Sequence, residues 1–403
     1  MRVTTKQALG FVSAVAITGL LSISPAQADA GFQKWIRDFK STAVKNGVSS
    51  KTYDRAFAKV KTPDAAVLQK ARFQPEFKDK AWQYIDSRVN ERTVANGQKM
   101  ARKYKRLLDQ IERNTGVSRY IILAIWSMES SYGEALKDPS RLHYVPRALA
   151  TLAYADRRRA KFARGQLIGA LKIAQRGDVS LNGLTGSWAG AMGHTQFIPT
   201  SYQAYALDGD GDGKKDIWNS IPDALYTAAN LLKKNGWQSG QTWGYEVKLP
   251  SGRKFPGGSQ SLNAWSKIGV KRANGKAFPR SQSAELKVLQ GRDGPAFLMI
   301  KNFFVIKRYN NADKYALGVG LLADQIAGYP APTRDWKRPY TRISVAQAEE
   351  LQRHLKRSGF YDGAIDGKPG PQTRNAIKAF QSRNGLAQDG YPSLEVLSVI
   401  RRR

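Results

Sequence analysis

Residues 121–133 read Ile-Ile-Leu-Ala-Ile-Trp-Ser-Met-Glu-Ser-Ser-Tyr-Gly, an apolar run with one charged residue near its end. The run predicts a helix that follows an N-cap at Ser118 and stops at its final glycine. In such a helix Glu129 shares one face with Ile121 and Ile125. Burial disfavours a charged carboxylate, so this face would raise the pKa of Glu129. A protonated Glu is the acid that glycosidic bond cleavage requires, and the alternative is a helix-end Glu that reaches solvent.

A second segment, residues 186–201, combines glycine with polar and aromatic residues. It reads Gly-Ser-Trp-Ala-Gly-Ala-Met-Gly-His-Thr-Gln-Phe-Ile-Pro-Thr-Ser. Glycine lets the backbone adopt a positive φ or approach a ligand closely. The segment is therefore a candidate binding loop, and the alternative is an ordinary glycine-rich junction between helices.

The chain begins with the features of a secretory signal. Two basic residues precede an apolar stretch at residues 8–23, and residues 25–28 read Pro-Ala-Gln-Ala, a small-residue cleavage site. We expect residues 1–28 to be removed and the mature protein to begin at Asp29 in the periplasm. A retained membrane span is less favoured because the stretch is short and interrupted by polar residues. The chain has no cysteine, which excludes a lipid anchor on an N-terminal Cys, disulfides and thiol catalysis.

The protein is strongly basic. Its formal charge is +33, and it falls to +31 when Arg2 and Lys6 are removed with the signal. Such a charge predicts an anionic partner. For an exported chain an anionic envelope polymer fits better than nucleic acid, for which the sequence has no recognisable motif. The three histidines lie far apart and lack zinc-site spacing: His143, His194 and His354.

Helical spacing and strand alternation predict a mainly α fold of the α+β class. Residues 31–116 have the spacing of helices, whereas Trp243, Tyr245, Val247 and Leu249 alternate as in a strand. Residues 297–306 could supply another strand. We therefore expect a helical catalytic domain with a small β-containing subdomain.

The composition changes near a Pro-containing stretch at residues 329–333. We place a linker at residues 330–342, between a catalytic domain at 29–329 and a small module at 343–403. Within the module, residues 346–358 and 371–383 predict helices separated by Asp-Gly turns.

Several motifs resemble those of the membrane-bound lytic murein transglycosylase B family. The most specific are Glu-Ser-Ser-Tyr-Gly at 129–133 and Gly-Ala-Met-Gly-His-Thr-Gln-Phe-Ile-Pro-Thr-Ser at 190–201. Other matches are Arg-Phe-Gln-Pro-Glu-Phe at 72–77, residues 230–237, and Arg-Tyr-Asn-Asn at 308–311 with Tyr315. The resemblance spans residues 31–328. It implies a lysozyme-like catalytic domain that acts on peptidoglycan as a carbon–oxygen lyase.

The resemblance also implies a reaction in which Glu129 is first an acid and then a base. It protonates the oxygen between N-acetylmuramic acid and N-acetylglucosamine, and its carboxylate then helps remove the proton from the C6 hydroxyl. That hydroxyl attacks C1 and leaves a 1,6-anhydromuramoyl end without consuming water. The implied substrate contacts are Ser187, Met192, Gln196, Asn310 and Tyr315, together with Arg158 and Arg159, which would meet carboxylates or peptide.

The residues themselves favour this chemistry over hydrolysis by two carboxylates. A two-carboxylate glycosidase needs a second acid at a defined separation. Glu134 and Asp138 follow the predicted helix end and should be solvated. An intramolecular hydroxyl and the acetamido group of the substrate can replace the missing carboxylate. The alternatives are a hydrolytic muramidase, in which a distant Asp folds alongside Glu129, and a noncatalytic wall-binding scaffold.

Residues 208–216 read Asp-Gly-Asp-Gly-Asp-Gly-Lys-Lys-Asp and have the ligand spacing of a calcium-binding loop. Asn219 occupies the position of the usual bidentate Glu, and the family resemblance implies that a later Asp replaces it. The predicted metal-site residues are Asp208, Asp210, Asp212, Lys214 and Asp223. The Ca²⁺ would be structural, since the chemistry requires no cofactor, and the alternative is a solvated turn.

The C-terminal residues resemble a type 1 peptidoglycan-binding module. The matching stretches include Gly-Phe-Tyr-Asp-Gly at 359–363, Ile-Asp-Gly at 365–367 and Gly-Pro-Gln-Thr-Arg at 370–374. A three-helix module of this kind would anchor the enzyme to the wall and raise the local substrate concentration. We expect a monomer without a membrane anchor whose partner is the peptidoglycan glycan strand.

Overall fold

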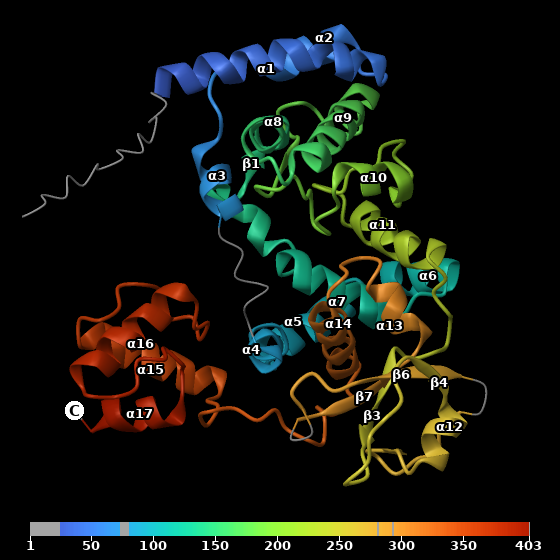
Figure 1. The fold of residues 1–403 in the computed structure, drawn as a ribbon, viewed down its shortest axis with the longest axis vertical. Helices are drawn as coiled ribbons and strands as arrows, with labels where there is room; N and C mark the ends of the chain where they lie inside the picture. Colours follow the sequence, from blue (N-terminus) through green and yellow to red (C-terminus); the bar gives the residue numbers. More distant parts are fainter. Residues whose placement is uncertain (1–24, 73–79, 280–281, 292–293, 403) are drawn as a thin grey trace, which may run out of the picture.

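The computed structural model describes residues 25–72, 80–279, 282–291 and 294–402. Within them the fold is mainly helical, with a small sheet and a C-terminal helical module (Figure 1). Residues 1–24 of the predicted signal lie outside this part of the chain, as do residues 73–77 of the predicted motif at 72–77. None of the helices in the described residues combines the length and apolar character that a membrane crossing needs.

Helices make up most of the catalytic region. The first are α1 (Pro25–Lys45), α2 (Ser50–Phe57), α3 (Ala65–Arg72), α4 (Ala81–Arg88), α5 (Glu91–Lys103), α6 (Lys105–Thr115), α7 (Arg119–Ser130), α8 (Val145–Ala155) and α9 (Ala160–Arg176). Then follow α10 (Pro199–Tyr205), α11 (Ile221–Lys234), α13 (Lys301–Ile306) and α14 (Asp313–Ile326). Short elements between them are the 3-10 helices η2 (Glu134–Lys137) and η3 (Pro139–Arg141) and the paired strands β1 (His143–Tyr144) and β2 (Thr185–Gly186).

Helix α7 occupies the centre of this region. Eight of its 12 residues are buried, and it packs on α5, α6, α11 and α14. In Figure 1 it runs between the α8 to α11 group on one side and α14 on the other. The apolar run that predicts the helix therefore also forms the middle of the main core, because burial on nearly all sides requires apolar residues all round.

A five-stranded antiparallel sheet forms the small subdomain, in the order β4-β6-β7-β3-β5. Its elements are β3 (Gly244–Lys248), β4 (Ser259–Ser261), α12 (Leu262–Lys267), β5 (Lys271–Arg272), β6 (Ser283–Lys287) and β7 (Ala296–Met299). The alternation from Trp243 to Leu249 thus correctly predicts β3. The second predicted strand, at 297–306, is only partly right: β7 ends at Met299, and residues 301–306 form α13. In α13 the buried residues Asn302, Phe303 and Ile306 recur at helical spacing.

The C-terminal module consists of α15 (Val345–Arg357), α16 (Pro371–Arg383) and α17 (Leu394–Arg401). It has its own core, which includes the buried residues Leu351, Ile377, Phe380 and Leu397. The two helices predicted from the sequence correspond closely to α15 and α16. The prediction of a small three-helix module is therefore confirmed.

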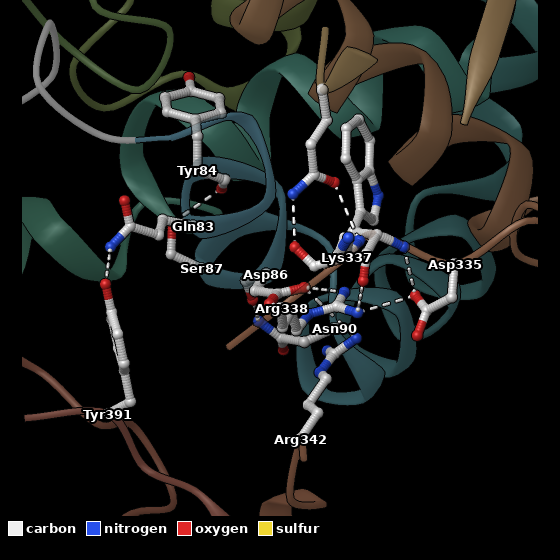
Figure 2. A network of polar contacts seen from close by, with 12 residues as sticks. Gln83, Tyr84, Asp86, Ser87, Asn90, Asp335, Lys337, Arg338, Arg342 and Tyr391 are labelled. Atoms are coloured by element: carbon white, nitrogen blue, oxygen red, sulfur yellow. Dashed lines mark hydrogen bonds and ion pairs between the residues drawn. The ribbon is translucent and has the colours of Figure 1, made fainter. Parts of the chain in front are cut away.

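The segment predicted as a linker, residues 330–342, is packed against the catalytic region. Trp336 is buried in the main core. The guanidinium of Arg338 forms two 2.7 Å contacts with the carboxylate of Asp86 on α4, and its side chain is only 5% exposed. Figure 2 shows Arg338 between Asp86 and Asp335. A buried bidentate ion pair holds its partners in one geometry. Residues 330–342, called the strap below, are therefore fixed against the catalytic region.

Aromatic rings extend this contact to the module. The ring of Trp82 on α4 lies 5.5 Å from that of Tyr340 and 5.3 Å from that of Tyr391. The hydroxyl of Tyr391 accepts a hydrogen bond from the side-chain amide of Gln83 at 2.9 Å (Figure 2). The module therefore contacts the catalytic region through α4.

Candidate active site

Glu129 lies in the last turn of α7. Ile121 and Ile125, on the same stripe of the helix, are buried as predicted. Ser118 is the N-cap residue, although its side chain makes no capping hydrogen bond. Glu129 keeps a small exposed surface, while its carboxyl group is surrounded by protein atoms. The carboxyl group of Glu129 therefore lies at the end of a buried helix, where the core meets the surface.

The chain leaves the helix abruptly after this residue. The predicted end at Gly133 is three residues late, since α7 ends at Ser130 and the backbone is left-handed at Ser131 (φ 52°) and Tyr132 (φ 61°). Among the described residues, the non-glycine residues with positive φ are these two and Gln196 (φ 50°). A side chain in this region is strained, and such strain gathers at functional sites. All three residues lie in the two segments that the sequence singles out.

Tertiary contacts with the second segment explain the early helix end. The Ser130 hydroxyl donates to the carbonyl of His194 at 2.6 Å, and the indole N–H of Trp126 donates to His194 Nδ1 at 3.2 Å. A Cβ on Gly133 would lie 2.4 Å from the His194 ring. The end of α7 is therefore joined to the loop that carries Gln196, and glycine is required where the ring approaches.

Two tyrosines from distant positions surround Glu129. The Tyr315 hydroxyl, on α14, donates a hydrogen bond to Glu129 Oε1 at 2.5 Å. The ring of Tyr309 is parallel to that of Tyr315 at a centroid separation of 6.4 Å, and the Tyr309 hydroxyl donates to the carbonyl of Thr195 at 2.5 Å. Burial raises the pKa of both tyrosines well above the usual value, so both stay protonated. At neutral pH each is therefore an uncharged hydroxyl that can donate a hydrogen bond.

Burial raises the pKa of Glu129 from 4.5 to about 7. The hydrogen bond from Tyr315 and the positive charge of Arg88 on α4 act in the opposite direction, because both favour the carboxylate. The guanidinium of Arg88 lies over the ring of Tyr84, 5.5 Å from its centroid. A carboxyl group with this pKa is present in both protonation states near neutral pH, as a group acting as acid and then base must be.

The three predicted substrate contacts in the glycine-rich segment differ in exposure. Ser187 is partly exposed, and its hydroxyl accepts a 3.0 Å hydrogen bond from the backbone N–H of Ala191. Gln196 is also partly exposed, with its side-chain amide donating to the carbonyl of Gly193 at 2.9 Å. Met192 is fully buried in the main core. Its side chain fills the core while its backbone pairs with Phe197, and the predicted contact of Met192 with the substrate stays a prediction.

The remaining predicted contacts differ in exposure. Asn310 is exposed and directly follows Tyr309. Arg159 is ion-paired with Asp156, and its guanidinium lies 5.5 Å from the centroid of Trp188, the neighbour of Ser187. Arg158 has a side chain that is 78% exposed. The structure thus joins Tyr315 directly to Glu129 and Arg159 to the Ser187 segment, whereas Arg158 lies in solvent.

The Asp-rich loop brings three carboxylates together. Oxygens of Asp208, Asp210 and Asp212 all lie within 4.8 Å of one another. Asp208 accepts hydrogen bonds from the backbone N–H groups of Gly211 and Gly213, and these amides lower its pKa. Asp223 is outside this group. Oxygen ligands of this kind suit Ca²⁺.

The other two predicted metal-site residues are occupied by local contacts. Asp223 is fully buried, and its two carboxylate oxygens accept from the N–H groups of Gly209 at 2.7 Å and Asp216 at 2.6 Å. Lys214 donates its backbone N–H to Asp212 at 2.8 Å. Three carboxylates thus lie close together, and the Asp223 carboxylate accepts hydrogen bonds from the loop backbone.

Comparison with known proteins identifies the family. The transglycosylase SLT domain family matches residues 31–324, which include every predicted site residue. The chain belongs to the transglycosylase SLT domain family. A peptidoglycan binding domain family matches residues 344–400. The membrane-bound lytic murein transglycosylase B of Escherichia coli K12 is 32% identical over 254 residues, which are 61% of this chain and 68% of that protein.

Solved structures of SLT-domain proteins share this fold. SltB3 from Pseudomonas aeruginosa, in complex with NAG-NAM-pentapeptide, is 43% identical with a TM-score of 0.73, covering 92% of this chain and 99% of that chain. The same protein in complex with NAG-anhNAM-pentapeptide has a TM-score of 0.72. The Escherichia coli lytic transglycosylase Slt35 in complex with calcium is 27% identical with a TM-score of 0.61, covering 74% of this chain and 93% of that chain. The predicted lysozyme-like domain with its wall-binding module is thus confirmed.

Some residues of this SLT domain's site were not assigned roles from the sequence. Tyr309 lies within the recognised stretch at 308–311, so its position in a family motif was a usable signal. His194, whose spacing in the sequence speaks against a zinc site, joins the two signature segments. Arg88 has no sequence signal, because its effect on Glu129 depends on how α4 packs near α7.

Proposed function

We propose that the chain is an exported lytic transglycosylase. It would cleave the β-1,4 bond between N-acetylmuramic acid and N-acetylglucosamine in peptidoglycan, with Glu129 as both acid and base. The observation that carries this proposal is the Glu129 carboxyl group at the edge of the core, hydrogen-bonded by Tyr315. The complexes of SltB3 with NAG-NAM-pentapeptide and with NAG-anhNAM-pentapeptide support the substrate class and the anhydro product.

The proposed reaction has two proton transfers at the same carboxyl group. Protonated Glu129 gives its proton to the glycosidic oxygen as the bond from C1 to that oxygen breaks. The carboxylate then accepts the proton of the C6 hydroxyl, whose oxygen forms the new bond to C1. Glu129 ends protonated, as it began. Tyr315 would hold Oε1 in place and stabilise the carboxylate between the two transfers.

The surroundings of Glu129 favour this reaction over hydrolysis by two carboxylates. Among the residues that the structure describes, the influences that set its pKa are burial, the Tyr315 hydroxyl and Arg88, and none of these is a second carboxylate. An inverting or retaining glycosidase places its two carboxyl groups within about 5 to 9.5 Å of each other. A substrate hydroxyl held next to C1 can take the place of the second group, since intramolecular attack gains from proximity.

Two accessory roles complete the proposal. The module at 343–403 would hold the enzyme on the wall, and the basic surface would favour an anionic polymer over neutral ones. Asp208, Asp210 and Asp212 would hold a structural Ca²⁺, whose charge would offset most of the repulsion between three carboxylates brought close together. The E. coli structure in complex with calcium supports this role.

Mass spectrometry of the products from purified sacculi tests the function. The expected products are muropeptides with 1,6-anhydromuramoyl ends. Reducing muramic acid ends in their place would show a hydrolytic muramidase, and binding of sacculi without any released product would show a scaffold. Catalysis in ¹⁸O-labelled water sharpens the result, because transglycosylation adds no label to the products.

A further inference from the structure

We propose that the turn at residues 216–218 is a positioning element that sets the two substrate-binding segments against each other, with Trp218 as its key side chain. This inference rests on the proposed function, since it assigns substrate contacts to Ser187 and Gln196. The turn closes the Asp-rich loop. It gives that part of the molecule a role in substrate binding without contacting the substrate itself.

The turn is hydrogen-bonded to both segments. The indole N–H of Trp218 donates to the carbonyl of Thr185 at 2.7 Å, two residues before Ser187. The carbonyl of Ile217 accepts from the backbone N–H of His194 at 2.9 Å, two residues before Gln196. Adjacent residues of one turn therefore each bond one of the two segments.

Packing leaves little freedom at this junction. Ile217 is fully buried, and Trp218 is 9% exposed with its ring 5.9 Å from that of Tyr202. A Cβ on Gly193 would lie 2.4 Å from the Ile217 carbonyl oxygen. The backbones thus approach more closely than any residue but glycine allows.

The turn at 216–218 is itself held by two carboxylates. Asp223, fully buried on α11, accepts from the N–H of Asp216 at 2.6 Å. The Asp216 carboxylate accepts from the N–H groups of Trp218 at 2.9 Å and Asn219 at 3.0 Å. These bonds to charged groups are stronger than neutral ones. The position of Trp218 is therefore fixed through Asp216 by Asp223 on α11.

The Glu129 carboxyl group is held by other contacts. Tyr315 donates to it from α14, and the end of α7 is attached to His194 through Ser130 and Trp126. Loss of the Trp218 hydrogen bond would loosen the Ser187 segment while leaving these contacts in place. We therefore expect weaker substrate binding, with the position and the pKa of Glu129 unchanged.

The test compares Trp218→Phe with a matched variant, Trp265→Phe. Trp265 is fully buried in the small subdomain, and its indole N–H donates to the carbonyl of Ala284 at 2.9 Å. Both variants keep an aromatic ring and lose one N–H to a backbone carbonyl. With soluble peptidoglycan strands we expect Trp218→Phe to raise KM by about tenfold, the equivalent of one good hydrogen bond. We expect kcat, its pH profile and the KM of Trp265→Phe to stay at wild-type values.

A second variant guards against misfolding of the first. Asp216→Ala removes the carboxylate that accepts from the backbone N–H of Trp218, which loosens the turn while the indole stays intact, and should also raise KM. Binding of the same strands to these variants in a Glu129→Gln background gives Kd without turnover. The inference is overturned if KM and Kd are unchanged while Tm falls as in Trp265→Phe, or if the pH profile shifts. A wild-type protein that releases no anhydro products would overturn the proposed function instead.

Discussion

The last turn of α7 and the loop at 208–216 shift the pKa of a carboxyl group in opposite directions. Burial raises the pKa of the single carboxyl group of Glu129 to about 7. In the loop, backbone amides lower the pKa of Asp208, and three carboxylates lie within 4.8 Å of one another. A carboxyl group in the first setting can give and take a proton, whereas the lowered pKa of Asp208 in the second favours a carboxylate that accepts from amides.

The largest difference should appear in catalysis. Glu129→Gln removes the acid and the base while keeping the shape of the side chain, so turnover should fall by about 10³-fold or more. Release of anhydro-muropeptides from sacculi measures this. Glu134→Gln is the control, because Glu134 is exposed and paired with Lys137. Equal turnover in the two variants would remove the distinction between Glu129 and a surface carboxylate.

The second prediction concerns stability. The folded-state pKa of Glu129, about 7, exceeds the ordinary 4.5, so between these values the folded protein binds more protons than the unfolded chain. The free energy of unfolding should therefore fall as pH rises from 4.5 through 7, by at most about 3 kcal/mol. Glu129→Gln should lose this component. Urea unfolding of both proteins at pH 5 and pH 8 measures it, and an identical pH dependence would contradict burial as the cause.

Tyr315→Phe sharpens the comparison by removing the one side-chain hydrogen bond recorded for the Glu129 carboxyl group among the described residues. That bond lowers the pKa of Glu129, so its loss should raise the pKa and move the fall in activity to higher pH. Turnover at the optimum should drop by about tenfold, as for a lost hydrogen bond to a charged group. Tyr53→Phe is the control, because its hydroxyl donates to the Ile36 carbonyl at 2.6 Å, far from the site in sequence. A shift to lower pH would contradict the assigned role.

The smallest effect on turnover should come from the loop. Asp210→Asn keeps an acceptor for the Ser220 hydroxyl, which lies 2.6 Å from Asp210 Oδ2, and should leave turnover within about twofold of wild type. Calcium at ten times its Kd should add about 1.4 kcal/mol to the free energy of unfolding of the wild-type protein and little to the variant. Thermal unfolding with calcium and with a chelator measures this, with Asp38→Asn as an exposed control. An equal response of both proteins to calcium would place the cation elsewhere.

Local sequence patterns determined α7, with Glu129 at its end, the alternation that forms β3, the Asp-rich loop and the helices of the C-terminal module. Periodicity and turn chemistry act over a few residues, so a single segment is enough to express them. Local patterns do not predict the helix end at Ser130, because the Ser130 side chain bonds a distant residue, His194.

Only the tertiary structure decided which partners surround these elements. Tyr315 reaches Glu129 across 186 residues of sequence, and burial then sets the pKa of the acid. The same packing buries Met192 away from solvent and docks the strap at 330–342 through Arg338. Contacts between distant segments depend on how complete helices pack, and no local pattern encodes that arrangement.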